Sequence, residues 1–145
     1  MKSETIHFVT DLFQVEPGED EETNPGISGK QLAYWVKKRF EENGYSDIEI
    51  VPEDWGWCVI LQRKPNLIWV GCSGQKGVEF STEYFEESEE GEEGITWNCF
   101  LVMEAPFFKK FLGNKNSTET FVKIREFLVG QLSINQDICF VKEAW

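Results

Sequence analysis

The sequence contains a single histidine, His7, and none of the motifs on which the common catalytic mechanisms depend. A Ser–His–acid or Cys–His mechanism would have to use His7, which lies in a strand-like segment, and the sequence has no nucleophile elbow. It also has no GxxxxGK(S/T) phosphate loop, and Gly71, Gly74 and Gly77 are not spaced as a dinucleotide fingerprint. We therefore predict no catalytic residue and no nucleotide cofactor.

Metal-ligand spacing is missing as well. The four cysteines, Cys58, Cys72, Cys99 and Cys139, form no C-x-x-C pair, and each lies within a strand-like run. The acidic stretch 83–93 lacks the alternating ligands of a calcium loop. We predict neither a metal nor another cofactor, and we expect the cysteines to be reduced, buried and in apolar surroundings.

Long hydrophobic runs are absent. No stretch approaches the roughly 18 consecutive apolar residues that mark a membrane-spanning helix. Residues 1–7 contain no apolar segment of the kind found in a secretory signal. We therefore expect a cytoplasmic protein that does not insert into a membrane.

Basic residues are scarce, since 14 Lys and Arg face 26 Asp and Glu and the formal net charge is −12. Such a surface repels the phosphates of nucleic acids and of anionic membranes, so neither is expected as a partner. It favours a basic protein or a cationic small molecule. Solubility alone is the alternative reason for an acidic composition.

A strand meander forms the centre of the predicted fold, over about residues 47–73. Its strands are expected at 48–51, 57–63 and 67–73, where β-branched and aromatic residues are bounded by turn-forming Pro, Asp, Gly and Asn. Further strands are predicted at 5–10, 78–84, 95–102 and 138–141.

One long helix is predicted before this meander. Ser28 is expected as its N-cap, with Gln31 completing a capping box, and Gly44 is expected to end it. Leu32, Val36 and Phe40 recur at helical spacing and predict an apolar stripe that packs on one face of the sheet.

Two more helices are predicted near the C-terminus, at 105–113 and from residue 116 or 117 to about 132. Gly130 within the second predicts close packing or an early end of the helix. Consecutive strands with segregated helices indicate an α+β fold with a mainly antiparallel sheet, in a single domain over residues 1–145.

The densest functional cluster is the stretch 52–57, Pro-Glu-Asp-Trp-Gly-Trp. Because Trp55 and Trp57 are two residues apart, an extended chain would place both rings on the same side. With the carboxylates of Glu53 and Asp54 beside them, these rings could hold a cation or an amine, and the four residues are the candidate ligand-binding site. The alternative is a strand entry with core tryptophans and an acidic turn.

This stretch also carries a resemblance to a known family. Together with Asn-Pro-Gly at 24–26, Ala-Tyr-Trp at 33–35 and Gly-Tyr at 44–45, it resembles a family of small uncharacterised bacterial domains over about residues 24–61. Glu-Asp-Trp-Gly-Trp is the most specific part. The resemblance implies a bacterial cytoplasmic protein and assigns no role to any residue.

Two functions follow as hypotheses. The first is a non-enzymatic interaction module, of an immunity-like or regulatory kind, whose acidic loops 16–22 and 83–93 steer a basic protein partner. The second is a binder of small cationic or amine ligands. The first is preferred because the charge covers the whole chain, whereas the second rests on one short segment. An enzyme using carboxylate acid–base chemistry is a third alternative, supported by no motif, and no oligomeric state is predicted.

Overall fold

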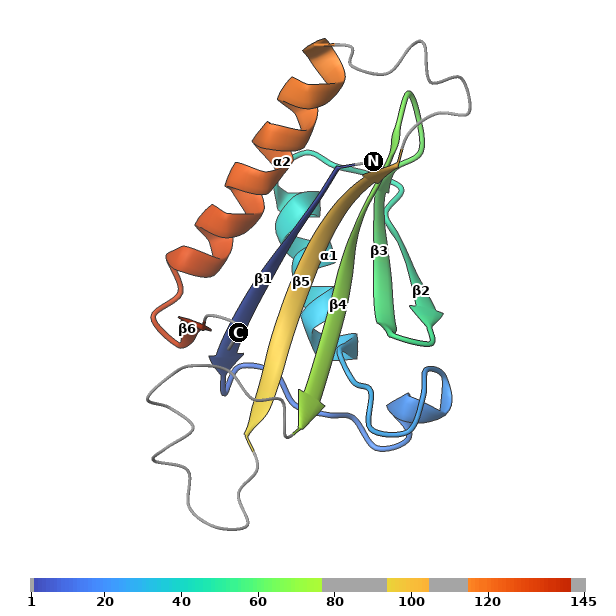
Figure 1. Cartoon of the computed structure of the whole chain (residues 1–145), viewed down its shortest axis with the longest axis vertical. Helices are drawn as coiled ribbons and strands as arrows, with labels where there is room; N and C mark the ends of the chain where they lie inside the picture. Colours follow the sequence, from blue (N-terminus) through green and yellow to red (C-terminus); the bar gives the residue numbers. More distant parts are fainter. Residues whose placement is uncertain (1, 77–93, 105–114, 142–145) are drawn as a thin grey trace.

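A computed structural model describes residues 2–76, 94–104 and 115–141 (Figure 1). The elements are β1 (Lys2–Thr10), the short 3-10 helix η1 (Glu19–Glu21), α1 (Lys30–Glu42), β2 (Glu49–Glu53), β3 (Gly56–Gln62), β4 (Leu67–Lys76), β5 (Ile95–Glu104), α2 (Lys115–Ser133) and β6 (Ile138–Val141). The six strands form one antiparallel sheet in the order β2-β3-β4-β5-β1-β6. The predicted α+β class, the antiparallel sheet and the central meander are therefore confirmed.

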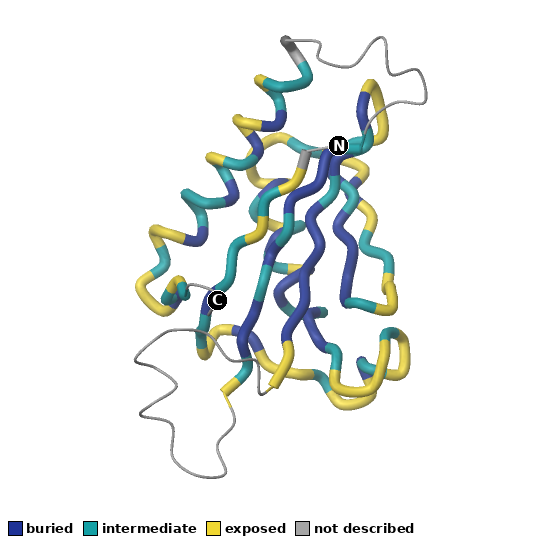
Figure 2. The backbone as a smooth tube through the Cα atoms, viewed as in Figure 1, coloured by how far each residue is buried: buried dark blue, intermediate teal, exposed yellow. Residues whose placement is uncertain are grey.

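The two α-helices pack on the same face of this sheet. Phe40 on α1 and Phe127 on α2 meet edge to face, with ring centroids 4.9 Å apart. Both helices contribute to one core together with inward-facing strand residues, and the most buried backbone follows the central strands (Figure 2). Its fully buried large side chains include Phe8, Leu32, Phe40, Val59, Ile68, Val70, Trp97, Leu101, Ile124, Leu128 and Leu132.

Alternation along the strands defines a second face of the sheet, which we call the outer face. Trp57 and Val59 on β3 point into the core, and their neighbours in register on β4, Cys72 and Val70, do the same. Residues of the other parity point to the outer face: Val51, Glu53, Cys58, Ile60, Trp69, Gly71, Phe100 and Val102. Neither described α-helix shares a core with these side chains.

The start of α1 differs from the prediction. The helix begins at Lys30 with Gly29 as its N-cap, and no side chain of the cap residue bonds to it. Ser28 is instead bridged to Gly74, whose carbonyl oxygen accepts both its N–H and its hydroxyl. The first-turn N–H groups of Gly29 and Lys30 donate to the carboxylate of Glu19, at 2.8 and 3.1 Å. The predicted capping box is therefore wrong, because a carboxylate from a distant loop takes its place.

The other helix predictions have mixed outcomes. Gly44 follows the end of α1 with φ +94°, which confirms its predicted role. The α2 helix continues through Gly130 to Ser133, and a methyl group at Gly130 would meet nothing within 4 Å. The inference of close packing or an early end there is wrong. No described helix is long and apolar enough to cross a membrane.

Several predictions fall outside the described residues, namely the strand at 78–84, the acidic loop at 83–93 and the helix at 105–113. All four cysteines are free thiols. Cys58, Cys72 and Cys99 are buried as predicted, whereas Cys139 is only half-buried.

Candidate functional site

The structure separates the two tryptophans of the predicted site. Trp55 lies with Asp54 in the two-residue turn between β2 and β3, whereas Trp57 belongs to β3 and is 3% exposed in the core. Gly56 between them adopts φ +149°, and a methyl group there would overlap the carbonyl oxygen of Cys72. Because this backbone is not extended, the prediction that both rings share one side is wrong.

Trp55 instead joins an aromatic cluster on the outer face, which consists of Trp55, Trp69 and Phe100. Its indole stacks on that of Trp69, with centroids 5.5 Å apart and an interplanar angle of 23°. Phe100 meets both indoles edge-on, at 4.8 Å from Trp55 and 5.6 Å from Trp69. All three side chains are half-buried, so the cluster is packed and yet partly accessible to solvent.

Gly71 makes room for this cluster. It lies on β4 opposite Phe100 of β5, and a methyl group at Gly71 would overlap the phenyl ring. The ring of Phe100 therefore lies directly over the sheet backbone at the glycine. Any larger residue at this position would displace the ring from the cluster.

Two carboxylates flank the aromatic cluster. The indole Nε1 of Trp69 donates to Oε2 of Glu104 at 3.0 Å, and Glu53 lies on the outer face at the end of β2. Burial, together with the charges of Glu53 and Glu104, raises the pKa of the nearby Cys58 thiol to about 12, and the charge of Arg63 opposes this rise. The Cys58 thiol thus lies within the field of both carboxylates.

Glu53 and Asp54 are exposed carboxylates at the hairpin that joins β2 and β3. In the ranges 2–76, 94–104 and 115–141, no ion pair involves either side chain. The backbone oxygen of Asp54 accepts a hydrogen bond from the side-chain amide of Asn24 at 2.9 Å. This bond attaches the acidic loop 16–22 and the residues that follow it to the turn that carries Trp55.

Trp57 already has a cation of its own. Nζ of Lys30 lies 5.5 Å from the centroid of its ring, and the same ammonium is 3.7 Å from a carboxylate oxygen of Glu16. The arrangement that the sequence suggested for a ligand, a cation over an indole beside a carboxylate, is therefore formed at Trp57 by the protein itself.

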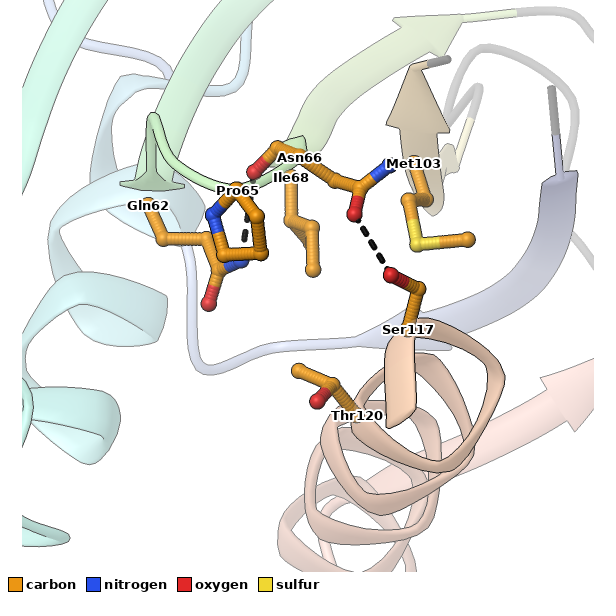
Figure 3. A pocket seen from close by; sticks show the side chains of 7 residues that line it. All are labelled: Gln62, Pro65, Asn66, Ile68, Met103, Ser117 and Thr120. Carbon is orange, nitrogen blue, oxygen red and sulfur yellow. Dashed lines mark hydrogen bonds between the residues drawn. The ribbon is translucent and has the colours of Figure 1, made fainter. Parts of the chain in front are cut away.

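A separate pocket of about 140 Å³ lies where the β3–β4 turn meets the first turn of α2 (Figure 3). Its lining residues are Gln62, Pro65, Asn66, Ile68, Met103, Ser117 and Thr120. The buried Asn66 accepts a hydrogen bond from the Ser117 hydroxyl at 2.7 Å, and its backbone oxygen accepts one from Gln62 at 3.1 Å. The first bond joins the turn to α2 and the second closes the turn itself, and we assign both a structural role.

Sequence reasoning found Glu53, Asp54 and Trp55 but missed Trp69, Phe100, Glu104 and Gly71. Trp69 and Phe100 lie 14 and 45 positions beyond Trp55 in the sequence, and only the register of β3, β4 and β5 brings them together. The available signal was the alternation of side chains between the two faces of a strand. Trp69 lies between the core residues Ile68 and Val70, so its side chain must face outward.

His7 pairs in register with Asn98 of β5 and with Val141 of β6. Its side chain lies on the face of β1 opposite to that of the core residue Phe8. Within the part of the chain that the structure describes, no three His, Cys, Asp or Glu side chains are grouped closely enough to hold a metal ion. Comparison with protein-family models, with curated proteins and with solved structures gave no match to this chain.

Proposed function

We propose that this protein is a non-enzymatic interaction module that binds a basic protein partner through its outer face. The aromatic cluster supplies the apolar centre of the contact surface, and Glu53, Asp54 and Glu104 supply its negative charge. The observation that carries the proposal is the exposure of Glu53 and Asp54, which pair with no Lys or Arg of the described residues, beside half-buried, stacked indoles.

The chemistry of this surface supports the proposal. Tryptophan is enriched among the residues that contribute most to protein–protein binding, especially where a ring of polar groups surrounds it. The carboxylates around the cluster match the positive charge of a basic partner. Since exposed acidic groups accelerate association more than they strengthen the complex, the net charge of −12 favours rapid capture of such a partner.

The acidic loop 16–22 would extend this surface. Glu19 anchors the loop at the start of α1, and the bond from Asn24 to Asp54 connects its continuation to the β2–β3 turn. Figure 1 shows η1 beside the end of β2. Glu21 and Glu22 are exposed on this loop, so they add charge near the site.

A small cationic or amine ligand is a second candidate for the same site. Trp55 and its neighbouring carboxylates favour it, because an indole face beside a carboxylate binds ammonium and guanidinium groups. Trp57 would not take part in this version of the site, since its ring is buried beneath Lys30.

The test is affinity capture with the full chain at about 0.05 M and about 0.5 M salt, which span weak and strong screening of surface charges. We expect a defined protein with a basic isoelectric point to be retained at low salt and released at high salt. The double variant Glu53→Gln, Asp54→Asn should lose it, whereas the control Glu41→Gln, Glu42→Gln, with the same charge change on α1, should retain it. Equal capture by both double variants, or saturable binding of amines without any protein partner, would contradict the proposal.

A further inference from the structure

The chain uses one recognition unit twice within its own fold. The guanidinium carbon of Arg39 lies 5.6 Å from the ring centroid of Trp35, and Nη2 of Arg39 is 3.4 Å from Glu42. Lys30 lies over Trp57 beside Glu16 in the same way. Each unit consists of an indole, a cation over its ring and a carboxylate that pairs with the cation.

A third indole, that of Trp55, lies on the same face of the sheet as a carboxylate, and no cation of the described residues lies over it. Trp55 projects onto the outer face, and Glu53, which closes the same hairpin, belongs to that face as well. Within the described parts of the chain, no Lys or Arg lies over the ring of Trp55, and none pairs with Glu53. Among the described residues, two such units are thus complete, and the group at Trp55 and Glu53 has no positive partner.

We propose that an arginine side chain of the basic partner completes this third unit, with its guanidinium stacked on Trp55 and its N–H groups donating to Glu53. This inference rests on the proposed function and specifies the group that the site recognises. The cation would come from a protein segment, because the proposed partner is a basic protein attracted by the net charge of −12.

Arginine suits this site better than lysine for two physical reasons. A guanidinium is planar and weakly hydrated, so it can lie flat on an indole while its edge donates two parallel hydrogen bonds to a carboxylate. An ammonium is a compact, strongly hydrated point charge and loses more solvation on approaching a half-buried ring. The Trp55–Trp69 stack provides an extended flat surface, which matches the planar group.

The experiment compares fluorescein-labelled penta-arginine and penta-lysine peptides by fluorescence anisotropy, with the full chain at about 0.15 M salt. The two peptides have the same charge, so attraction to the acidic surface contributes similarly to both. We expect the arginine peptide to bind more tightly by about two- to fivefold, the range that corresponds to a cation–π contact at an exposed site. Free arginine amide serves as the small-molecule arm and should bind far more weakly than the peptide.

Substitutions show which residues cause the preference for the arginine peptide over the lysine peptide. Trp55→Ala and Glu53→Gln should each reduce the arginine-to-lysine ratio towards one, and Glu53→Gln keeps the fold intact because its side chain is exposed. The controls Tyr34→Ala, which removes an aromatic ring that is 52% exposed on α1, and Glu41→Gln should leave the ratio unchanged.

The possible results distinguish a failure of the arginine inference from a failure of the proposed function. Equal dissociation constants for both peptides, or an arginine preference that persists in Trp55→Ala and Glu53→Gln, would overturn the arginine inference and leave a charge-driven partner site intact. No binding of either peptide under these conditions would contradict the proposed function together with the inference.

Discussion

The indole of Trp55 stacks on that of Trp69, with centroids 5.5 Å apart, although the two residues belong to a hairpin turn and to a different strand. The contact holds the turn against the outer face and keeps both rings half-buried. Trp57, two residues after Trp55, lies on the opposite face under Lys30. One short segment therefore contributes one ring to the core and another to the candidate binding surface.

The first prediction concerns the glycine beneath the cluster. Gly71→Ala should lower the free energy of unfolding by about 1–3 kcal/mol, because the added methyl group overlaps the Phe100 ring and forces it to move. The near-UV circular dichroism of the cluster should change at the same time. Urea denaturation at equilibrium measures the stability.

Gly130→Ala is the matched control for this substitution. The methyl group meets nothing within 4 Å there, and alanine is favoured over glycine inside a helix, so stability should rise by about 0.5–1 kcal/mol. If both substitutions changed the free energy of unfolding in the same direction, the close approach of Phe100 to Gly71 would be refuted.

The second prediction concerns the cap of α1. Glu19→Ala should cost about 1–2 kcal/mol of stability, because its carboxylate is 2% exposed and accepts the N–H groups of Gly29 and Lys30. Glu19→Gln retains an acceptor oxygen and should cost less. Thermal and urea unfolding measure the stability of these two variants and of the control Glu22→Ala, whose side chain is exposed. If Glu22→Ala lost as much stability as Glu19→Ala, the capping role of Glu19 would be refuted.

The third prediction concerns the internal cation at Trp57. Lys30→Gln removes the ammonium over the ring and should lower stability by about 0.5–1 kcal/mol. Lys37→Gln on the same helix removes an equal charge from a side chain without such a contact and serves as the control. Indistinguishable urea midpoints for these two variants would show that the Lys30–Trp57 contact contributes nothing.

The fourth prediction follows from the pKa of Cys58, which is raised to about 12 by burial and by the charges of Glu53 and Glu104. The unfolded thiol loses its proton near pH 9, whereas the folded thiol keeps it until about pH 12, so unfolding releases a proton in this window. Stability should therefore fall as the pH rises above about 9, with a contribution from Cys58 of up to about 1.4 kcal/mol per pH unit.

Cys58→Ala should show a shallower fall of stability over the same pH range. Part of the slope should remain, because burial also raises the pKa of Cys72. Urea denaturation at pH 8 and at pH 10 measures the difference. Identical slopes for the variant and the original chain would mean that Cys58 ionises equally readily in the folded and unfolded states.

Much of the sheet could be predicted because its signals are local. Turn residues at 52–56 and 64–66 bound strands whose apolar residues alternate, and the observed β2, β3 and β4 follow these limits within a few positions. The last strand, Ile138–Val141, matches its predicted range. The apolar stripe of α1, formed by Leu32, Val36 and Phe40, was equally visible from its spacing.

The errors arose where contacts over a longer range, or an unusual backbone, override local preference. Ser28 has the chemistry of a cap, but its hydroxyl donates to Gly74, and Glu19, ten residues before Gly29, caps the helix instead. Trp55 and Trp57 would share a side in an extended strand, but Gly56 at φ +149° turns the chain between them. The aromatic cluster requires strand register, which the sequence does not specify residue by residue.

The central claim is that a cationic segment binds at the outer-face cluster rather than anywhere on an acidic surface. The most direct measurement is a titration of the full chain with penta-arginine, followed by NMR through the indole N–H signals, which Trp→Phe variants assign. The account predicts that the Trp55 and Trp69 signals shift together and saturably, while those of Trp35, Trp57 and Trp97 stay in place. Shifts spread over all the indoles, or largest at Trp35 or Trp57, would contradict it.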